Sequence, residues 1–87
     1  MLQTMVGRMS YTAEFFKLRK CGRAKGKYLF YRRMSVDHIS DLVVGSFLNI
    51  MSKQGNAHKF YIDRKEHVYY DNEKEYYVQY FIREIKQ

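Results

Sequence analysis

Residues 15–31 read FFKLRKCGRAKGKYLFY, and this stretch predicts a basic β-hairpin. The aromatic and aliphatic residues on either side favour strands. Gly22 and Gly26 permit the positive φ angles that a tight connection requires. We therefore expect a hairpin over residues 13–34. A competing interpretation makes residues 13–20 a short helix, capped by Thr12 and ended by Gly22.

Positive charge is concentrated in this part of the chain. Residues 1–34 hold nine Lys or Arg and one acid, Glu14, whereas residues 35–56 have a net charge of −1 and residues 57–87 are balanced. A surface that only keeps a protein soluble mixes both signs. A segment that carries the whole excess indicates contact with a polyanion, and a solubilising hairpin is the alternative.

The candidate binding residues are the bases and tyrosines of the hairpin. Cations neutralise phosphates, aromatic rings stack on unpaired bases, and the Gly22–Gly26 loop offers backbone N–H groups to an anion. Alternate strand residues share a face, so one side of the second arm is expected to carry Lys27, Leu29, Tyr31 and Arg33. For each tyrosine, packing in the core is the alternative role. The predicted nucleic-acid-binding residues are Lys17, Arg19, Lys20, Arg23, Lys25, Lys27, Tyr28, Tyr31, Arg32 and Arg33.

Residues 36–53 predict an amphipathic helix. Ser35 is a suitable N-cap, and Gly55 lies where a helix commonly ends. Apolar residues recur at spacings of three and four, which places them on one helical face. They are Ile39, Leu42, Val43, Phe47, Ile50 and Met51.

The C-terminal third predicts three more strands. Residues 59–62, 67–70 and 76–82 are rich in β-forming residues and are separated by polar stretches that favour turns at 63–66 and 71–74. The last strand also fits a helical pattern, with Asn72 and Glu75 as a capping box.

Together these patterns predict the α+β class, as an antiparallel sheet with one packed helix in the order ββαβββ. The chain has the length of one domain. We expect a frayed N-terminus over residues 1–10 and a single α+β domain over residues 11–87.

Catalytic and metal-binding patterns are weak. His38 with Asp37 and Asp41 forms D-H-x-x-D, which suits a metal-assisted nuclease, but a solvated first helical turn is favoured. A second group of acids could serve acid–base chemistry, but solvated turns are favoured for them as well. These acids are Glu66, Asp71, Glu73 and Glu75. We expect no enzyme activity, metal or cofactor, and a small metal-independent ribonuclease is a less favoured alternative.

The cellular setting follows from what the sequence lacks. Cys21 is the only cysteine, so an intramolecular disulfide and a Cys-x-x-Cys zinc site are excluded. No stretch has the roughly 18 apolar residues of a membrane span. We expect a cytoplasmic protein without membrane contact.

In composition the chain resembles the small basic accessory proteins of virulent bacteriophages. It is short, rich in Lys, Tyr, Phe and Ile, and free of Pro and Trp. In size and charge it is similar to the RNA-associated phage inhibitors of toxin–antitoxin systems. The resemblance implies the host cytoplasm as location and a host protein or ribonucleoprotein as a further partner.

The sequence thus predicts a non-catalytic module that binds nucleic acid, preferably RNA or single strands, and that regulates or inhibits a host system. The alternative is a protein-interaction module that blocks an acidic partner.

Overall fold

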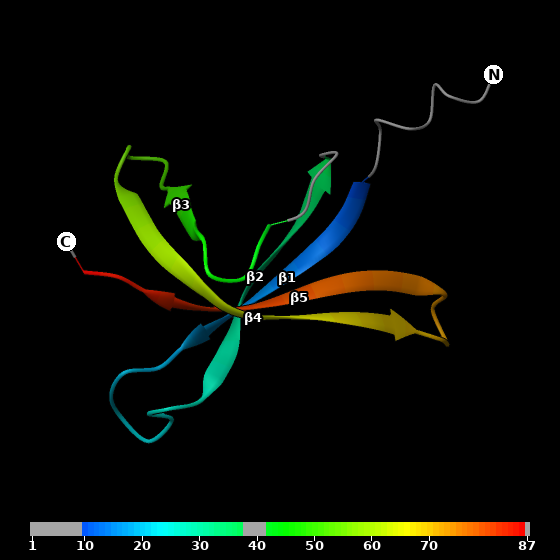
Figure 1. The fold of residues 1–87 in the computed structure, drawn as a ribbon, viewed down its shortest axis with the longest axis horizontal. Coiled ribbons are helices and arrows are strands. Elements are labelled where there is room, and N and C mark those ends of the chain that lie inside the picture. Colours follow the sequence, from blue (N-terminus) through cyan, green and yellow to red (C-terminus); the bar gives the residue numbers. More distant parts are fainter. Residues whose placement is uncertain (1–9, 38–41, 87) are drawn as a thin grey trace.

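The computed structural model describes residues 10–37 and 42–86, and throughout these ranges the chain is all-β (Figure 1). One sheet is formed in the order β2-β1-β5-β4-β3. Neighbouring strands are antiparallel except for β1 and β5, which are parallel. The strands are β1 (Ser10–Leu18), β2 (Tyr28–Asp37), β3 (Phe47–Met51), β4 (Ala57–Tyr70) and β5 (Glu75–Glu84).

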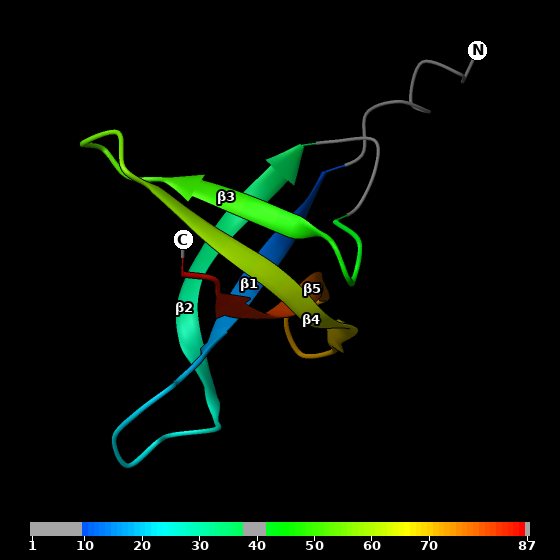
Figure 2. The same ribbon diagram turned by 60° about the vertical axis from the view of Figure 1, so that its left-hand side comes forward.

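The sheet is twisted and curls into a half-barrel, so β3 crosses in front of β2 in Figure 2. Its concave side carries the core, and Phe15 stacks on Tyr80 there with ring centroids 5.3 Å apart. Alternation along the strands directs these apolar side chains inward. The buried core comprises Ala13, Phe15, Val36, Ile50, Phe60, Ile62, Val78, Tyr80 and Ile82.

The predicted hairpin is confirmed, and the competing helix over residues 13–20 is wrong. β1 pairs with β2 from Ser10↔Asp37 to Leu18↔Tyr28. The register shifts between Phe15 and Phe16, which leaves Tyr31 as an extra residue in β2. This bulge breaks the expected alternation, as bulges do. Tyr31 packs against the core, whereas Arg33 lies on the convex side.

The predicted helix over residues 36–53 is wrong within the described residues. β2 continues to Asp37, and β3 occupies Phe47–Met51 with alternating burial. Gly45 has φ +91°, which a helix interior does not allow. Phe47 and Met51 are 55% and 61% exposed whereas Ile50 is buried, so the residues of the proposed helical face do not share one side. Residues 38–41 of the predicted helix lie outside the described residues, as do residues 1–9 of the predicted frayed terminus.

The turn predicted at residues 63–66 is absent, because β4 runs through it. The register shifts between Ile62 and Arg64, so Asp63 is an extra residue in β4. Its carboxylate accepts hydrogen bonds from the Tyr28 hydroxyl (2.7 Å) and from Arg83 Nε (2.9 Å). A polar residue in mid-strand is thus satisfied without a turn.

The C-terminal segment is the strand β5, and the helical alternative is wrong. The predicted turn at residues 71–74 is confirmed by hydrogen bonds from Glu73 N to Tyr70 O and from Lys74 N to Asp71 O. The α+β class with the order ββαβββ is therefore corrected to an all-β fold of five strands.

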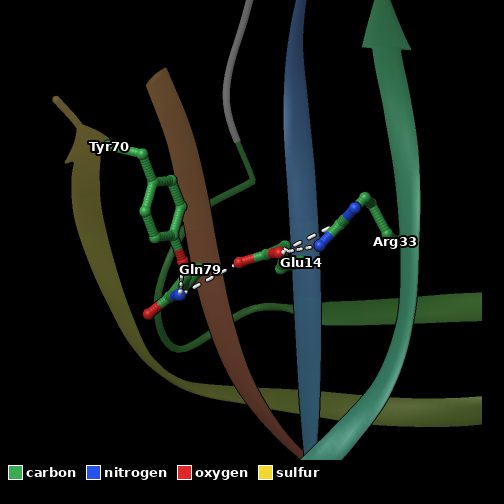
Figure 3. A network of polar contacts seen from close by, with 4 residues as sticks. All are labelled: Glu14, Arg33, Tyr70 and Gln79. Carbon is green, nitrogen blue, oxygen red and sulfur yellow. Dashed lines mark hydrogen bonds and ion pairs between the residues drawn. The ribbon is translucent and has the colours of Figure 1, made fainter. Parts of the chain in front are cut away.

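A buried carboxylate joins the two long hairpins on the convex side (Figure 3). Glu14 in β1 is 4% exposed. It accepts hydrogen bonds from Arg33 Nη2 of β2 (2.8 Å) and from Gln79 Nε2 of β5 (3.0 Å). Gln79 also donates to the Tyr70 hydroxyl of β4. A buried charge is stable only when it is paired and hydrogen-bonded, and here four strands share that task.

Candidate nucleic-acid interface

The loop between β1 and β2 closes on itself through backbone hydrogen bonds. Arg19 N donates to Lys27 O and Gly26 N donates to Arg19 O, each at 2.9 Å. Inside this frame Lys25 N donates to Gly22 O. Gly22 and Gly26 have φ +84° and +85°, a region that costs other residues energy. The loop is therefore a shaped turn that holds five bases and no acid over residues 19–27.

A basic pocket of about 310 Å³ lies at the base of this loop. It forms where the end of β1 meets the end of β5, which the parallel β1–β5 pairing brings together. Four of its side chains are cationic and one is acidic. The lining residues are Lys17, Leu18, Arg19, Lys20, Cys21, Glu84 and Lys86.

The single acid of the pocket already has partners within the protein. Glu84 Oε1 lies 3.8 Å from Lys17 Nζ, and Glu84 Oε2 lies 3.1 Å from His58 Nδ1. Lys20 Nζ donates to the Glu84 backbone oxygen at 2.7 Å, which leaves the Lys20 charge uncompensated. The pocket therefore keeps an excess of positive charge.

Five cationic side chains at this end of the molecule have no hydrogen-bond, ion-pair or ring partner among residues 10–37 and 42–86. Four of them belong to the loop, where the Arg19 guanidinium lies near Gly22. All except Lys86 were predicted from the sequence. They are Arg19, Arg23, Lys25, Lys27 and Lys86.

The two predicted tyrosines are held by contacts within the protein. Tyr28 donates its hydroxyl hydrogen to Asp63 and packs edge-on against Phe81. That hydrogen bond, together with burial, raises the pKa of the Tyr28 hydroxyl. The Tyr31 ring packs on Phe60 and lies under Lys17 Nζ at 4.9 Å. Stacking of bases on either ring would compete with these contacts.

The two arginines of β2 differ in their surroundings. Arg33 is bonded to Glu14 and lies over the Tyr77 ring, and the hydrogen bond raises the pKa of the Arg33 guanidinium. Arg32 is exposed and lies over the Tyr31 ring at 5.2 Å. Lys17 is half-buried in the pocket wall. These three cations lie beside the five cationic side chains that have no partner, but each has contacts of its own.

The sequence did not point to Lys86, Glu84 or Phe30. Lys86 and Glu84 reach the pocket only because β5 pairs in parallel with β1, and no local pattern predicts that pairing. Phe30 and its neighbour Leu29 lie beside the loop and are 55% and 43% exposed. These two side chains provide apolar surface next to the cations.

Other candidate sites are weaker. Among the described residues no three His, Cys, Asp or Glu side chains group as metal ligands. His38 and Asp41 of the D-H-x-x-D pattern lie outside those residues. The acids of the second candidate group, Glu66, Asp71, Glu73 and Glu75, are exposed. No helix in the described part of the chain could cross a membrane.

Comparison of the chain with protein-family models, with curated proteins and with solved structures gave no match.

Proposed function

We propose that the chain is a non-catalytic module that binds RNA or single-stranded nucleic acid through the β1–β2 loop and the basic pocket at its base. The observation that carries the proposal is the cluster of five cations without a partner inside the described parts of the protein. Cationic side chains that form no ion pair within the protein contribute most to the affinity for a polyanion. Their binding releases the counterions condensed on the phosphates.

The preference for single strands rests on the apolar surface beside the cations. Phe30 and Leu29 are exposed on β2 where it leaves the loop. Unpaired bases stack on aromatic faces, whereas the bases of a duplex are stacked on one another. The pocket of about 310 Å³ can hold one phosphate with its sugar. A flexible single strand can place these groups in the pocket, whereas a rigid, wide duplex cannot.

A salt titration tests the proposal quantitatively. If the five free cations each contact a phosphate of a single strand, the slope of log K against log salt is about −3.5, from ~0.7 per contact. Filter binding of a short RNA of mixed sequence measures this slope, and the duplex of the same sequence should bind more weakly. The absence of binding at low salt would overturn the proposal.

Charge reversal supplies a second test with a matched control. Glutamate at Arg19, Lys20, Arg23 and Lys25 should abolish RNA binding while the circular dichroism spectrum is retained. The control is reversal of Lys53 and Lys74, exposed residues of the β3–β4 and β4–β5 turns, compared with reversal of Arg23 and Lys25 alone so that both variants change two charges. Equal loss in both variants would indicate non-specific charge attraction and contradict the assignment. Nuclease-resistant capture of one acidic protein, without RNA, would favour a protein-blocking role instead.

A further inference from the structure

The convex side of the sheet carries a row of flat side chains that crosses four strands. Residues in direct register on neighbouring strands share a face, and alternation from Glu14 assigns the row to the convex side. Three strand spacings of roughly 4.8 Å give the row a length of about 14 Å. The row consists of Phe30 in β2, Phe16 in β1, Phe81 in β5 and Arg64 in β4, each in register with the next.

The members of this row pack against one another and leave its two ends open. The Phe16 ring stacks on Phe81 with centroids 5.2 Å apart, and Phe30 meets Phe16 edge-on at 5.8 Å. The Arg64 guanidinium covers Phe81 at 4.1 Å from the ring centroid. Phe81 in the middle is only 9% exposed, whereas Phe30 is 55% exposed and the Arg64 side chain 56%. Each end of the row therefore offers a flat group to a ligand.

The acidic side chains near this row are already neutralised. Each has an arginine partner within 3.4 Å, and the pairs are Glu14 with Arg33, Asp63 with Arg83 and Glu66 with Arg64. A polyanion that approaches this face meets paired carboxylates rather than free ones. Because Glu66 compensates the charge of Arg64, that arginine offers the plane of its guanidinium group more than a net charge.

We propose that a single strand held by the basic loop continues over the convex face, with one base stacked on Phe30 and a second base stacked on the guanidinium of Arg64. Unpaired bases stack on aromatic rings and on arginine planes alike. The inference rests on the proposed function, because the loop supplies the phosphate contacts. Phe30 is two residues from Tyr28, where β2 begins after the loop, which is roughly 7 Å at about 3.3 Å per residue.

The concave side of the sheet is less suited to this role. Its side chains form the core, and β3 crosses in front of β2 there (Figure 2). Leu29, the exposed neighbour of Phe30, pairs with Lys17 on that side and has no ring to stack on a base. The convex side therefore provides the flat groups and the open approach.

The first test compares a short RNA of mixed sequence with a strand of equal length that keeps every phosphate and sugar but has no bases. Filter binding to the wild-type protein should be at least about tenfold tighter for the natural strand, because two stacked bases contribute to its affinity. Equal affinity for the two strands would overturn the inference. If both strands then still gave a salt slope of about −3.5, the proposed function would stand, since that slope counts phosphate contacts alone.

Two variants remove the flat groups one at a time. Phe30→Leu keeps an apolar side chain without a ring, and Arg64→Lys keeps the charge without the plane. Each should reduce the preference for the natural strand about fivefold and leave the salt slope unchanged, because no phosphate contact is lost. The matched control is Tyr69→Leu, at a residue 57% exposed on the other hairpin, and it should leave the preference unchanged. Equal effects of Phe30→Leu and Tyr69→Leu would contradict the assignment.

A fluorescent reporter locates the bases directly. The chain contains no Trp, so Phe30→Trp places a single indole at the open end of the row. The natural strand should quench its fluorescence, and the strand without bases should quench it much less. Leu29→Trp, at the neighbouring residue that is 43% exposed, should respond weakly to both strands. A stronger response from Leu29→Trp would place the bases on the concave side, and an unquenched Phe30→Trp that still binds RNA would leave no base on the row. Either result would overturn the inference.

Discussion

The two long hairpins of the protein, β1–β2 and β4–β5 (Figure 1), are both antiparallel pairs with one register shift, but the segments that close them differ in charge. The loop of the first has five bases and no acid, whereas the turn of the second, residues 71–74, has two acids and one base. The second hairpin carries exposed tyrosines at Tyr69 and Tyr76 instead. A hairpin of this fold therefore does not need a cationic tip. The positive charge of the β1–β2 loop is available for binding.

The largest expected effect concerns the core that joins both hairpins. Phe15 in β1 is 1% exposed and stacks on Tyr80 in β5. Phe15→Ala leaves a cavity there and should lower the free energy of unfolding by about 3–5 kcal/mol, a large share of the stability of so small a domain. Urea denaturation measures the loss.

The matched control is Phe30→Ala, at a residue of the same type that is 55% exposed. It loses mainly the edge-on contact with Phe16, which is worth about 1 kcal/mol. If both variants lose the same stability, the two hairpins do not share the core described above.

A smaller effect is expected in RNA binding when the first loop loses two cations. Arg23→Ala with Lys25→Ala should make the salt slope shallower by about 1.4, from ~0.7 per contact, and weaken binding about 25-fold at 0.1 M salt. The folding stability should stay within about 0.5 kcal/mol, because both side chains are exposed. An unfolded variant would show that the loop charges are structural.

An effect of about 1 kcal/mol is expected from Tyr28→Phe, which removes the hydrogen bond to Asp63 and leaves Arg83 on that carboxylate. The hydrogen bond raises the pKa of Tyr28 in the folded state above its unfolded value of about 10. Its stabilisation is therefore complete below pH ~10 and is lost as the pH rises through the folded pKa.

Thermal melts of wild type and Tyr28→Phe between neutral and alkaline pH test this sign. The difference in stability should be constant below pH ~10 and should shrink above it. A difference that grows with pH would show that Asp63 does not hold the Tyr28 proton.

The smallest effect is expected at the tip of the second hairpin. Lys74 has φ +54°, in the left-handed region that glycine tolerates best. Lys74→Gly should relieve that strain and raise stability by about 0.5 kcal/mol after the entropy cost of glycine. The variant also loses one cation, yet its RNA salt slope should match the wild type. A shallower slope would place the second hairpin in the interface.

Local patterns predicted the β1–β2 hairpin and the turn at residues 71–74, but not the β3–β4 hairpin, the unbroken course of β4 through residues 63–66 or the way the hairpins are joined. Gly22 and Gly26 predicted the first turn, and residues 71–74 predicted the second. The spacing of Ile39, Leu42, Val43, Phe47, Ile50 and Met51 suggested a helix, although Leu48 and Ile50 point inward from a strand with a period of two. Short apolar runs fit both periods, and the positive φ of Gly45 is visible only in the structure.

Only part of the candidate site was predicted, because sequence patterns are local and the site also depends on contacts between distant strands. The cations of the loop are contiguous in sequence, so composition identified them. Lys86 reaches the pocket through a long-range strand pairing that no pattern encodes. Tyr28 and Tyr31 could not be separated from core residues by sequence, because their partners, Asp63 and Phe60, belong to a distant strand.

The parallel pairing of β1 with β5 has a kinetic consequence. Glu14 and Gln79, which are bonded across this pair, are 65 residues apart. Bringing such distant segments together costs about 4 kcal/mol of loop entropy, from (3/2)RT ln n. Domains dominated by non-local strand pairs fold in milliseconds to seconds. During synthesis β1 and β2 leave the ribosome long before β5, and an isolated two-stranded hairpin is only marginally stable in water. The hairpin that carries the basic loop is therefore stabilised only when β5 has been synthesised and paired with β1.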